Sequence, residues 1–490
     1  MKKHIIIIGA GIAGLTAGIY ARRSGFDVTL IEQHRISGGM CTGWWRKGYF
    51  FEGAMHWLTG SDPQTALHQI WRDTGALRDD VPVFFHEPFR SVERGGQTVH
   101  LYRDIDKTAE HLISVSPEDA PHIRQLVKEV KALANMQMPI FDIKGVKAKN
   151  PQKMSLGFLR NMLSALPTMR RLRKLTCHAY AMRFIHPGIQ RIFHVVPGDF
   201  QASSLIFTLA SLHMGDGGYP AGGSLAMANR MEKTFTDLGG NLRLHTQAKK
   251  INIANGVVTG VTLDDTELRA DAVIVTQETI SALKHLIDKP PQDTWIKKLC
   301  TNGNVQTCTF VSIGVRTMMP ETWLPEWKLK TPIRYAGETV ESLAFNSYAA
   351  YKNYAPKGCT ALTAAFLHDT YDFWKRAKSE GRYKEEKQAL AEQVCRALCE
   401  KYPQAEGNIE VVDIATPLTY ERYTGAYRGA WMTVIGPQDK MRRDLGTIEG
   451  VCGLYFAGHR LMSPGGLPAA AASGRQAAQL VCKQFDVEFC

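Results

Sequence analysis

The sequence lacks the marks of several large classes of protein. Its 490 residues contain no uncharged run of 18 apolar residues, so we expect no membrane-spanning helix. It has no C-x-x-C, no H-E-x-x-H and no other zinc-ligand spacing, so we expect no bound metal. The ten cysteines are scattered along a chain that is long enough to fold without disulfides. This cysteine usage is typical of a reducing compartment and predicts a cytoplasmic protein.

Internal repeats and low-complexity linkers are also missing. The composition is 44% hydrophobic and 22% charged, which is ordinary for a globular protein and excludes a disordered, collagen-like or coiled-coil chain. At roughly 150 residues per domain, the length predicts about three domain-sized units or two large ones.

Acidic residues are absent between Asp142 and Asp199, where the chain carries eleven lysines and arginines of a net charge of +12. Apolar residues from Leu156 to Leu175 lie between these cations. A basic amphipathic segment is attracted to an anionic membrane, so we expect a peripheral membrane contact here. The alternatives are a solvated helical face and a nucleic-acid patch. No nucleic-acid motif accompanies the charge, so we expect no nucleic-acid partner.

The first thirty residues predict a βαβ unit. A basic start and the apolar run 4–8 resemble a signal peptide, but glycines at 9, 11 and 14 follow, and no polar cleavage region does. We expect a strand at 4–8, a helix at 12–24 and a second strand at 27–31.

The turn of this unit, Gly9-Ala10-Gly11-Ile12-Ala13-Gly14, has the spacing of a dinucleotide-binding loop. The first glycine permits the tight turn, the second lets a pyrophosphate approach, and the third lets helix and strand pack. Glu32 ends the second strand and would accept hydrogen bonds from a ribose, whereas it would repel a 2′-phosphate. The ligand is therefore expected to be FAD or NAD and not NADP.

Other segments favour FAD. Gly38-Gly39-Met40 offers bare backbone beside a pyrophosphate, and Gly453 to His459 reads as a short strand ending in glycine. Pro464-Gly465-Gly466-Leu467-Pro468 opens an alanine-rich helix expected at 468–482. We also expect strands at 246–251 and 272–275, a helix at 222–238, and a polar turn at 265–271.

The sequence resembles the FAD-dependent amine-oxidase-like superfamily, and within it the branch of phytoene desaturases, carotenoid isomerases and retinol saturases. The branch motifs are Gly39 to Thr42 with Trp45, Gly48, Gly53, His56 and Trp57; Tyr219 to Ser224; and Thr416 to Thr419 with Arg422 to Gly425. Three positions depart from the family. Met40 stands where arginine is common, Glu52 stands where aspartate is common, and His459 replaces the usual acidic residue that reaches the ribitol.

The resemblance implies an α/β fold in which a Rossmann-like, glutathione-reductase-like FAD domain is discontinuous. That domain would comprise 1–70, 215–285 and 440–490, and an α+β substrate and membrane-contact domain would comprise 71–214 and 286–439. The implied FAD contacts are Gly9, Gly11, Ala13, Gly14, Glu32, Gly38, Gly39, Met40, Ala248, Gly458, His459, Leu467 and Pro468. No second G-x-G-x-x-G encodes an NAD(P) domain, so the electron donor or acceptor stays unknown.

The resemblance also implies an oxidoreductase or flavin-dependent isomerase acting on carbon–carbon bonds of an apolar isoprenoid or polyene. A flavin amine or porphyrinogen oxidase and a non-catalytic prenyl-lipid carrier of the same fold are the alternatives. His56, Arg422 and Tyr423 are the catalytic candidates, and Glu52 and Tyr427 are further candidates for the cavity wall or for proton transfer. Aromatic residues gather between 44 and 57, where they would form core or line a polyene tunnel.

Overall fold

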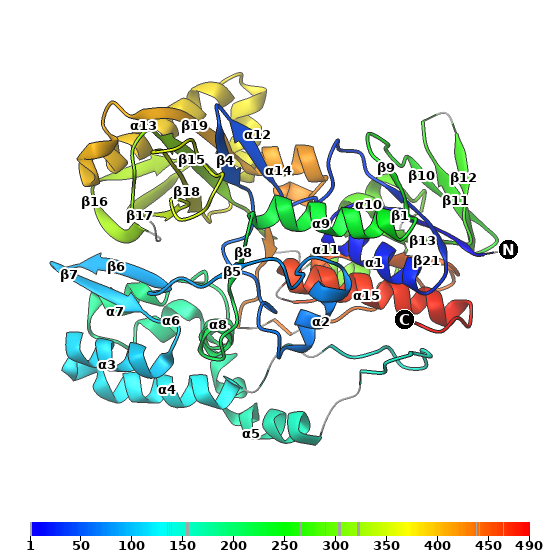
Figure 1. The fold of residues 1–490 in the computed structure, drawn as a ribbon, viewed down its shortest axis with the longest axis horizontal. Coiled ribbons are helices and arrows are strands. Elements are labelled where there is room, and N and C mark those ends of the chain that lie inside the picture. The colour runs from blue at the N-terminus through cyan, green and yellow to red at the C-terminus, as the bar shows by residue number, and fades with distance from the viewer. Residues whose placement is uncertain are drawn as a thin grey trace.

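The computed structural model describes residues 2–490 apart from 135, 137, 139, 153–155, 265, 290, 302–304, 321–323, 438, 441 and 464. Lys153 of the basic segment, Asp265 of the expected turn and Pro464 of the expected helix start lie outside the described residues. Figure 1 shows three lobes: one at the right that holds both termini, a mixed lobe at the upper left, and a helical lobe at the lower left.

The right-hand lobe is built on a five-stranded parallel sheet. Its strand order is β21 (Leu454–Phe456), β13 (Ala272–Val275), β1 (His4–Ile8), β2 (Asp27–Ile31) and β9 (Asn241–Arg243). Successive side chains of a strand point to opposite faces. Ile5 and Ile7 accordingly join one core cluster, while Ile6 and Ile8 join another. The isoleucine run is thus buried on both faces, as in other parallel sheets.

Helices cover one face of this sheet and a small sheet covers the other. The helices are α1 (Ile12–Arg23), α9 (Gly223–Asp237) and α15 (Gly466–Gln484), with α1 packed against both of the others. The small antiparallel sheet comprises β10 (Lys250–Ala254), β11 (Val257–Thr262) and β12 (Glu267–Arg269). Its Val258 and Val261 share a core cluster with Ile6 and Val273. Strands from the beginning, middle and end of the chain therefore meet in one layer.

A seven-stranded sheet extends from the upper-left lobe, where two helices pack against it, to the helical lobe, against which its last two strands lie (Figure 1). The order is β19 (Ile409–Ala415), β15 (Thr309–Val315), β18 (Thr360–Phe366), β17 (Glu338–Ser347), β16 (Leu324–Tyr335), β6 (Arg90–Arg94) and β7 (Gln97–Leu101). Trp374 of α12 (Tyr371–Ser379) and Val394 and Leu398 of α13 (Tyr383–Lys401) pack into its core.

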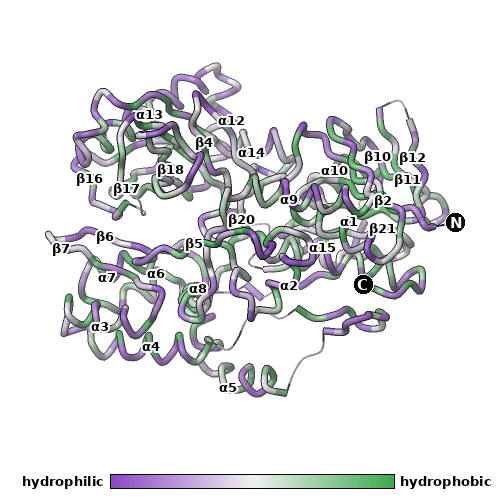
Figure 2. The backbone as a smooth tube through the Cα atoms, viewed as in Figure 1, coloured by the Kyte–Doolittle hydropathy of each residue, from purple (hydrophilic) through white to green (hydrophobic). Residues whose placement is uncertain are grey.

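The lower-left lobe is helical. It comprises α3 (Ile105–Val115), α4 (Ala120–Ala134), α5 (Leu156–Leu172), α6 (Cys177–Ala181), α7 (Pro187–Ile192) and α8 (Ala202–His213). The buried faces of α4, α6, α7 and α8 share one core cluster, whereas α5 contributes only Ala165 and Leu172 to it. Figure 1 shows α5 at the lower edge of the molecule, and Figure 2 shows hydrophobic and hydrophilic residues interleaved along it.

The remaining elements are short. They are β3 (Gly43–Arg46), β4 (Tyr49–Glu52), β5 (Val83–Phe84), β8 (Tyr219–Pro220), β14 (Val305–Gln306), β20 (Met432–Thr433), α2 (Ala66–Asp73), α10 (Thr279–His285), α11 (Thr294–Thr301) and α14 (Pro417–Thr424). No helix within the described ranges is long and apolar enough to cross a bilayer.

Two of the sequence expectations are wrong. The strand expected at 246–251 starts only at Lys250, because His245 adopts a positive φ of 51° and the backbone of Thr246 instead donates to the Glu32 carbonyl. The polar turn expected at 265–271 contains β12, whose Leu268 pairs with Val261. The strands at 4–8, 27–31 and 272–275 and the glycine-started helices are confirmed.

Candidate active site

A continuous cavity of about 1830 Å³ lies between the three lobes. Of the residues expected to bind the cofactor or to act in catalysis, all but Gly14 line it. A Cβ placed on Gly14 would lie 1.9 Å from the Gly9 carbonyl oxygen. Gly14 therefore lies behind the cavity wall, where the absence of a side chain lets α1 pack against the turn after β1.

The glycine turn forms one end of this cavity. Gly9 has a φ of 104°, and the amide of Gly38 donates to the Ala10 carbonyl, which brings the double glycine against the turn. A Cβ on Gly11 would approach the Gly38 carbonyl to 3.8 Å. Gly11 is also the N-cap of α1, with no side-chain cap on the first amides of that helix. Bare backbone and a helix N-terminus facing a cavity fit the diphosphate of a dinucleotide.

Glu32 lies beside the turn, at the end of β2. Its Oε2 accepts from the Ala10 amide at 2.8 Å and its Oε1 from the His34 amide at 2.8 Å. The carboxylate is buried, yet it forms part of the cavity wall. Each carboxylate oxygen has a further acceptor position, so Glu32 can also receive ribose hydroxyls. Ala248 lines the cavity next to it, on the chain that leaves β9.

The other end of the cofactor region lies around Gly458 and His459. The amide of Gly458 donates to Ser473 Oγ of α15 at 2.9 Å, and His459 folds toward Gly465. Burial, with a smaller contribution from Arg460, lowers the pKa of His459 to about 4, so the ring is neutral at neutral pH. Its Nδ1 is buried without a hydrogen-bond partner among the residues that the structure describes. An orphaned polar atom at this position fits a ligand hydroxyl, such as one of the ribitol chain.

Helix α15 begins at the same place. Its N-cap, Gly465, provides no side-chain cap, and Leu467 and Pro468 of its first turn line the cavity. The positive end of the helix dipole therefore faces the cavity. The glycine turn, Glu32, the double glycine, His459 and the start of α15 together fit an extended FAD molecule.

Beyond this region the cavity continues as an arm with apolar walls, which we call the apolar arm. It reaches α8 and the inner face of α5. Its wall is rich in methionine and aromatic side chains, among them Trp57, Phe158, Met162, Met169, Phe200, Phe207 and Met214. Methionine adapts its shape to irregular apolar ligands. An arm of this kind fits a long apolar molecule.

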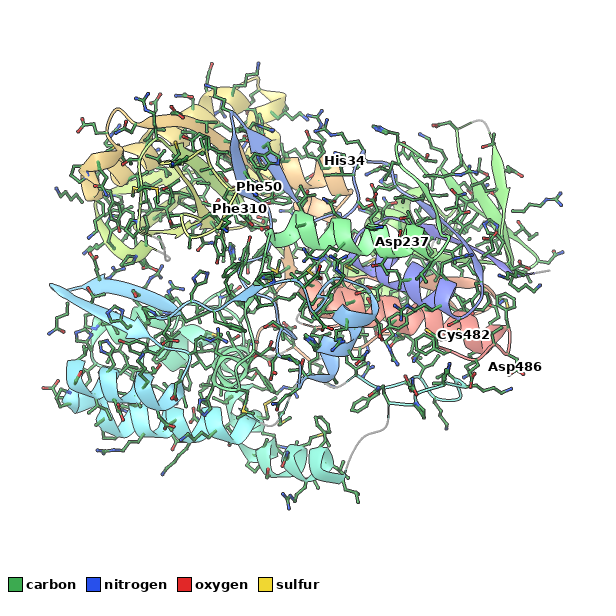
Figure 3. All side chains as sticks on the ribbon, viewed as in Figure 1. His34, Phe50, Asp237, Phe310, Cys482 and Asp486 are labelled. Carbon is green, nitrogen blue, oxygen red and sulfur yellow. The ribbon has the colours of Figure 1, made fainter. Side chains whose placement is uncertain are left out.

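His56 lies between the cofactor region and the apolar arm. Its ring lies 6.1 Å from that of Phe310 and 6.2 Å from that of Trp431, and burial lowers its pKa to about 4. Asn346 Nδ2 lies 2.7 Å from His56 Nδ1. When the amide donates this bond, the proton of the neutral ring is on Nε2. Figure 3 labels Phe310, the aromatic residue of β15 in this group.

Glu52 is held away from the cavity surface. Its carboxylate accepts from Tyr219 Oη at 2.6 Å, from the Ser224 amide at 3.0 Å and from the amides of Ala54 and Met55. A carboxylate with four donors is fixed in place, so Glu52 organises the loops behind His56.

Arg422 and Tyr423 lie on α14, at the Glu32 side of the cavity. The Tyr423 ring lies 5.2 Å from that of His34, which Figure 3 labels, and the Arg422 guanidinium lies 5.3 Å above the Tyr423 ring. The second tyrosine of α14, Tyr420, is buried and donates to the Gly53 carbonyl. The structure thus places Tyr423 next to the segment that follows Glu32, while His56 lies among Trp57, Phe310 and Trp431.

Sequence reasoning missed Asn346, Phe310 and Trp431. Asn346 is 290 residues from His56 and lies in a strand without any motif, so no local signal could have identified it. Some of the aromatic residues between 44 and 57 belong to the core, and others line the cavity. Phe51 and Tyr49 are core, whereas Trp44 and Trp57 line the cavity.

Comparison with known families gives one match that spans almost the whole chain. Residues 12–482 match the family described as "Flavin containing amine oxidoreductase". Among individual proteins, the chain is 28% identical over 302 residues to the neurosporene-forming phytoene desaturase of Rhodobacter capsulatus, covering 59% of this chain and 55% of the desaturase. It is 22% identical over 517 residues to the chloroplastic prolycopene isomerase of Daucus carota, covering 99% of this chain and 80% of the isomerase.

The chain thus spans little more than half of the bacterial desaturases that it matches. Solved structures give the same fold at lower identity. An oxidoreductase from Methanosarcina mazei superposes with a TM-score of 0.60 at 16% identity over 96% of this chain and 98% of its own. Cyclohexylamine oxidase from Brevibacterium oxydans superposes with a TM-score of 0.61 at 13% identity over 99% of this chain and 100% of its own.

Proposed function

Because this chain belongs to the flavin-containing amine oxidoreductases, we propose that it is an FAD-dependent enzyme that acts on carbon–carbon bonds of an apolar isoprenoid or polyene. The relatives named as phytoene desaturases and prolycopene isomerases favour this reaction class over an amine or porphyrinogen oxidase. They also favour it over a carrier without redox chemistry.

The observation that carries the proposal is the continuity of the apolar arm with the cofactor region in one cavity. When bound, FAD accepts or donates a hydride, and the protein orients the substrate against it. The apolar side chains of α5 and α8 that line the cavity exclude water from that region and contact the substrate along its length. A small polar amine would leave most of this apolar wall without contact.

His56 and Asn346 supply the polar groups at the junction. Since burial keeps His56 neutral, the imidazole does not place a charge beside an apolar substrate at neutral pH. The bond between Asn346 Nδ2 and His56 Nδ1 fixes the orientation of the imidazole ring. We propose that this pair orients the reacting segment of the substrate, with His56 in contact with it and Asn346 positioning the ring.

Incubation of the purified FAD-loaded enzyme with phytoene, cis-lycopene and retinol, under oxidising and reducing conditions, tests the function. We expect conversion of one polyene class, measured by chromatography, and none of benzylamine or protoporphyrinogen. Conversion of the amine or the porphyrinogen alone would contradict the proposal.

A variant that narrows the apolar arm connects the activity to the cavity. Ser204 of α8 lines this arm and is half-buried, so Ser204→Phe would fill it without touching the cofactor region. We expect the KM for the polyene to rise at least tenfold while the FAD content stays unchanged. Ser114→Phe, at an exposed position of α3, is the matched control. Equal kinetics of the two variants would show that the substrate does not occupy this arm.

We also propose that the basic segment attaches the protein to an anionic membrane through α5. Leu156 is 86% exposed and Leu163 57% exposed, with Leu159 between them on the same side of the helix. The opposite side carries Phe158 and Met162, which line the apolar arm. Helix α5 therefore has an exposed apolar surface on one side and forms part of the cavity wall on the other.

Some of the cations of the basic segment support the membrane proposal and others are paired within the protein. Lys147 pairs with Asp486, Arg171 with Glu129 and Arg191 with Glu326, so these three cations are partly neutralised within the protein. For Arg160, Arg170 and Lys174 no ion pair occurs in the part of the chain that the structure describes, and all three are exposed. They are available to lipid phosphates.

A further inference from the structure

The cavity has a second arm, which opens toward α12, α13 and α14 and which we call the basic arm. Its walls come from the β3–β4 hairpin, β19 and these three helices. The elements are joined directly: Trp44 Nε1 donates to Asp413 at 2.8 Å, and the Tyr383 and Thr416 hydroxyls lie 2.8 Å apart. Figure 1 shows α12 and α14 next to each other above the central helix α9.

Three cations of the basic arm have no carboxylate partner among the described residues. They are Lys378, at the end of α12, Lys387, in the second turn of α13, and Arg422 of α14. Lys387 Nζ lies 5.5 Å above the Tyr383 ring and Arg422 lies over Tyr423, so aromatic faces hold both. Asp413 is the carboxylate of this arm, and it is already engaged by Arg46 at 3.0 Å and by Trp44. The arm therefore carries an excess of positive charge.

Aromatic surface is exposed at the same place. Trp45 is 52% exposed and Tyr423 44% exposed, although both lie on the cavity wall. Single exposed aromatic side chains are ordinary on a protein surface, but these two lie on a cavity wall beside unpaired cations. A ligand with a flat ring and anionic groups would cover the exposed aromatic faces and pair with the three cations.

We propose that the basic arm binds a pyridine dinucleotide, NADH or NADPH, with its phosphates at Lys378, Lys387 and Arg422 and an aromatic ring against Trp45. This inference rests on the proposed function and names the class of its reductant: the dihydronicotinamide would pass a hydride to bound FAD and leave as NAD⁺ or NADP⁺, which serves saturation or isomerisation of the substrate. The cations lie on the wall of a cavity and not on a convex surface, which favours a small anionic molecule over an acidic protein. No separate dinucleotide domain is required, because the three helices already converge on the arm.

Fluorescence titration of the FAD-loaded protein with NADH and with NADPH tests the binding site. We expect saturable binding that weakens with added salt, and a Kd at least tenfold higher in Lys378→Glu/Lys387→Glu. The matched control is Lys375→Glu/Lys384→Glu, which makes the same charge change on the same two helices at positions outside the cavity wall. The control is expected to bind like the wild type.

Three results would overturn the inference: no saturable binding to the wild type, equal loss in both double variants, or loss of FAD from the Lys378→Glu/Lys387→Glu protein. The last result would mean that these lysines hold FAD itself. Should the charge reversal prevent folding, Lys378→Gln/Lys387→Gln with a circular dichroism spectrum like that of the wild type replaces it. The titration needs no polyene, so it can fail while polyene conversion succeeds, and the reverse.

Discussion

At the scale of single residues, Glu32 connects two segments of the chain at the wall of the cavity. It combines two backbone amides from separate segments, those of Ala10 and His34, with a place on the cavity wall. The carboxylate therefore holds the glycine turn in place while it faces the cavity.

We predict that Glu32→Arg strongly weakens FAD binding. The change removes the acceptor of both amides and of the ribose, and losing a hydrogen bond to a charged group costs about 1.5–3 kcal/mol, or roughly 10- to 150-fold in affinity. Equilibrium dialysis or flavin fluorescence measures the Kd. Glu267→Arg, an exposed position of β12, is the control. A folded Glu32→Arg protein with the wild-type Kd would remove Glu32 from the set of FAD contacts.

His56 couples the stability of the protein to pH. Burial lowers its pKa to about 4, below the ordinary value of about 6.5. Between these two values the unfolded chain binds a proton at His56 that the folded protein does not, so stability falls as the pH falls through this window. At pH 5 the loss from this one group is roughly 2 kcal/mol, and it is complete below pH 4.

We therefore predict that His56→Gln loses less stability between pH 7.5 and pH 5 than the wild type does. The comparison of thermal midpoints at the two pH values measures the difference. His285→Gln, at an exposed position of α10, should keep the wild-type pH dependence. An unchanged pH dependence in His56→Gln would argue against a neutral buried ring.

At the scale of elements, a buried carboxylate joins two lobes. Glu326 of β16 is 3% exposed and accepts from Arg90 Nη2 of β6 at 2.6 Å and from Arg94 Nη2 at 3.0 Å. Arg191 of α7 also contacts it. The helical lobe is thereby attached to the seven-stranded sheet at a point outside the cavity.

We predict that Glu326→Gln lowers the free energy of unfolding by about 3–5 kcal/mol, because it leaves three arginines around a neutral group. Hydrogen exchange should rise first in β6, β7 and α7, the elements that lose the carboxylate. Glu341→Gln, exposed on β17, is the control with the same chemical change. Protection in β6 and β7 equal to that of the control would show that apolar packing alone joins the lobes.

At the scale of the whole molecule, the membrane proposal concerns one edge, formed by α5. We predict that the protein floats with anionic vesicles and less so with neutral ones, and that salt weakens the binding. Arg160→Gln/Arg170→Gln/Lys174→Gln should lose roughly 3 kcal/mol of binding energy, at ~1 kcal/mol per cation.

The control for flotation removes three exposed cations of β16, Lys328, Lys330 and Arg334, at the same net charge. Arg171 and Arg173 stay unchanged, because the first pairs with Glu129 and the second lines the cavity. Equal loss in both triple variants would mean that the overall charge of the protein and not α5 determines the attachment.

Local sequence determined the cofactor end of the molecule. The isoleucine strand, the glycine turn, Glu32 and the glycine-started helix 466–484 are each specified within a few neighbouring residues, since turn geometry and strand burial depend on short-range sterics. The expected strands could therefore be predicted, apart from the one at 246–251, and the residues expected to contact FAD, apart from Gly14, line one cavity. There the positive φ of His245 and the bond from Thr246 to the Glu32 carbonyl redirect the chain.

Only the tertiary structure decided what surrounds the cofactor region. Asn346 reaches His56, Asp413 reaches Trp44, and Lys378 and Lys387 share a cavity with Arg422, across separations that no motif spans. The physical reason is that these residues are far apart in the sequence. They meet only when the chain folds, so packing and charge determine the contacts and local sequence patterns do not. The sequence could show a basic segment, but folding decided which of its cations are paired with Glu129, Glu326 and Asp486 and which stay exposed.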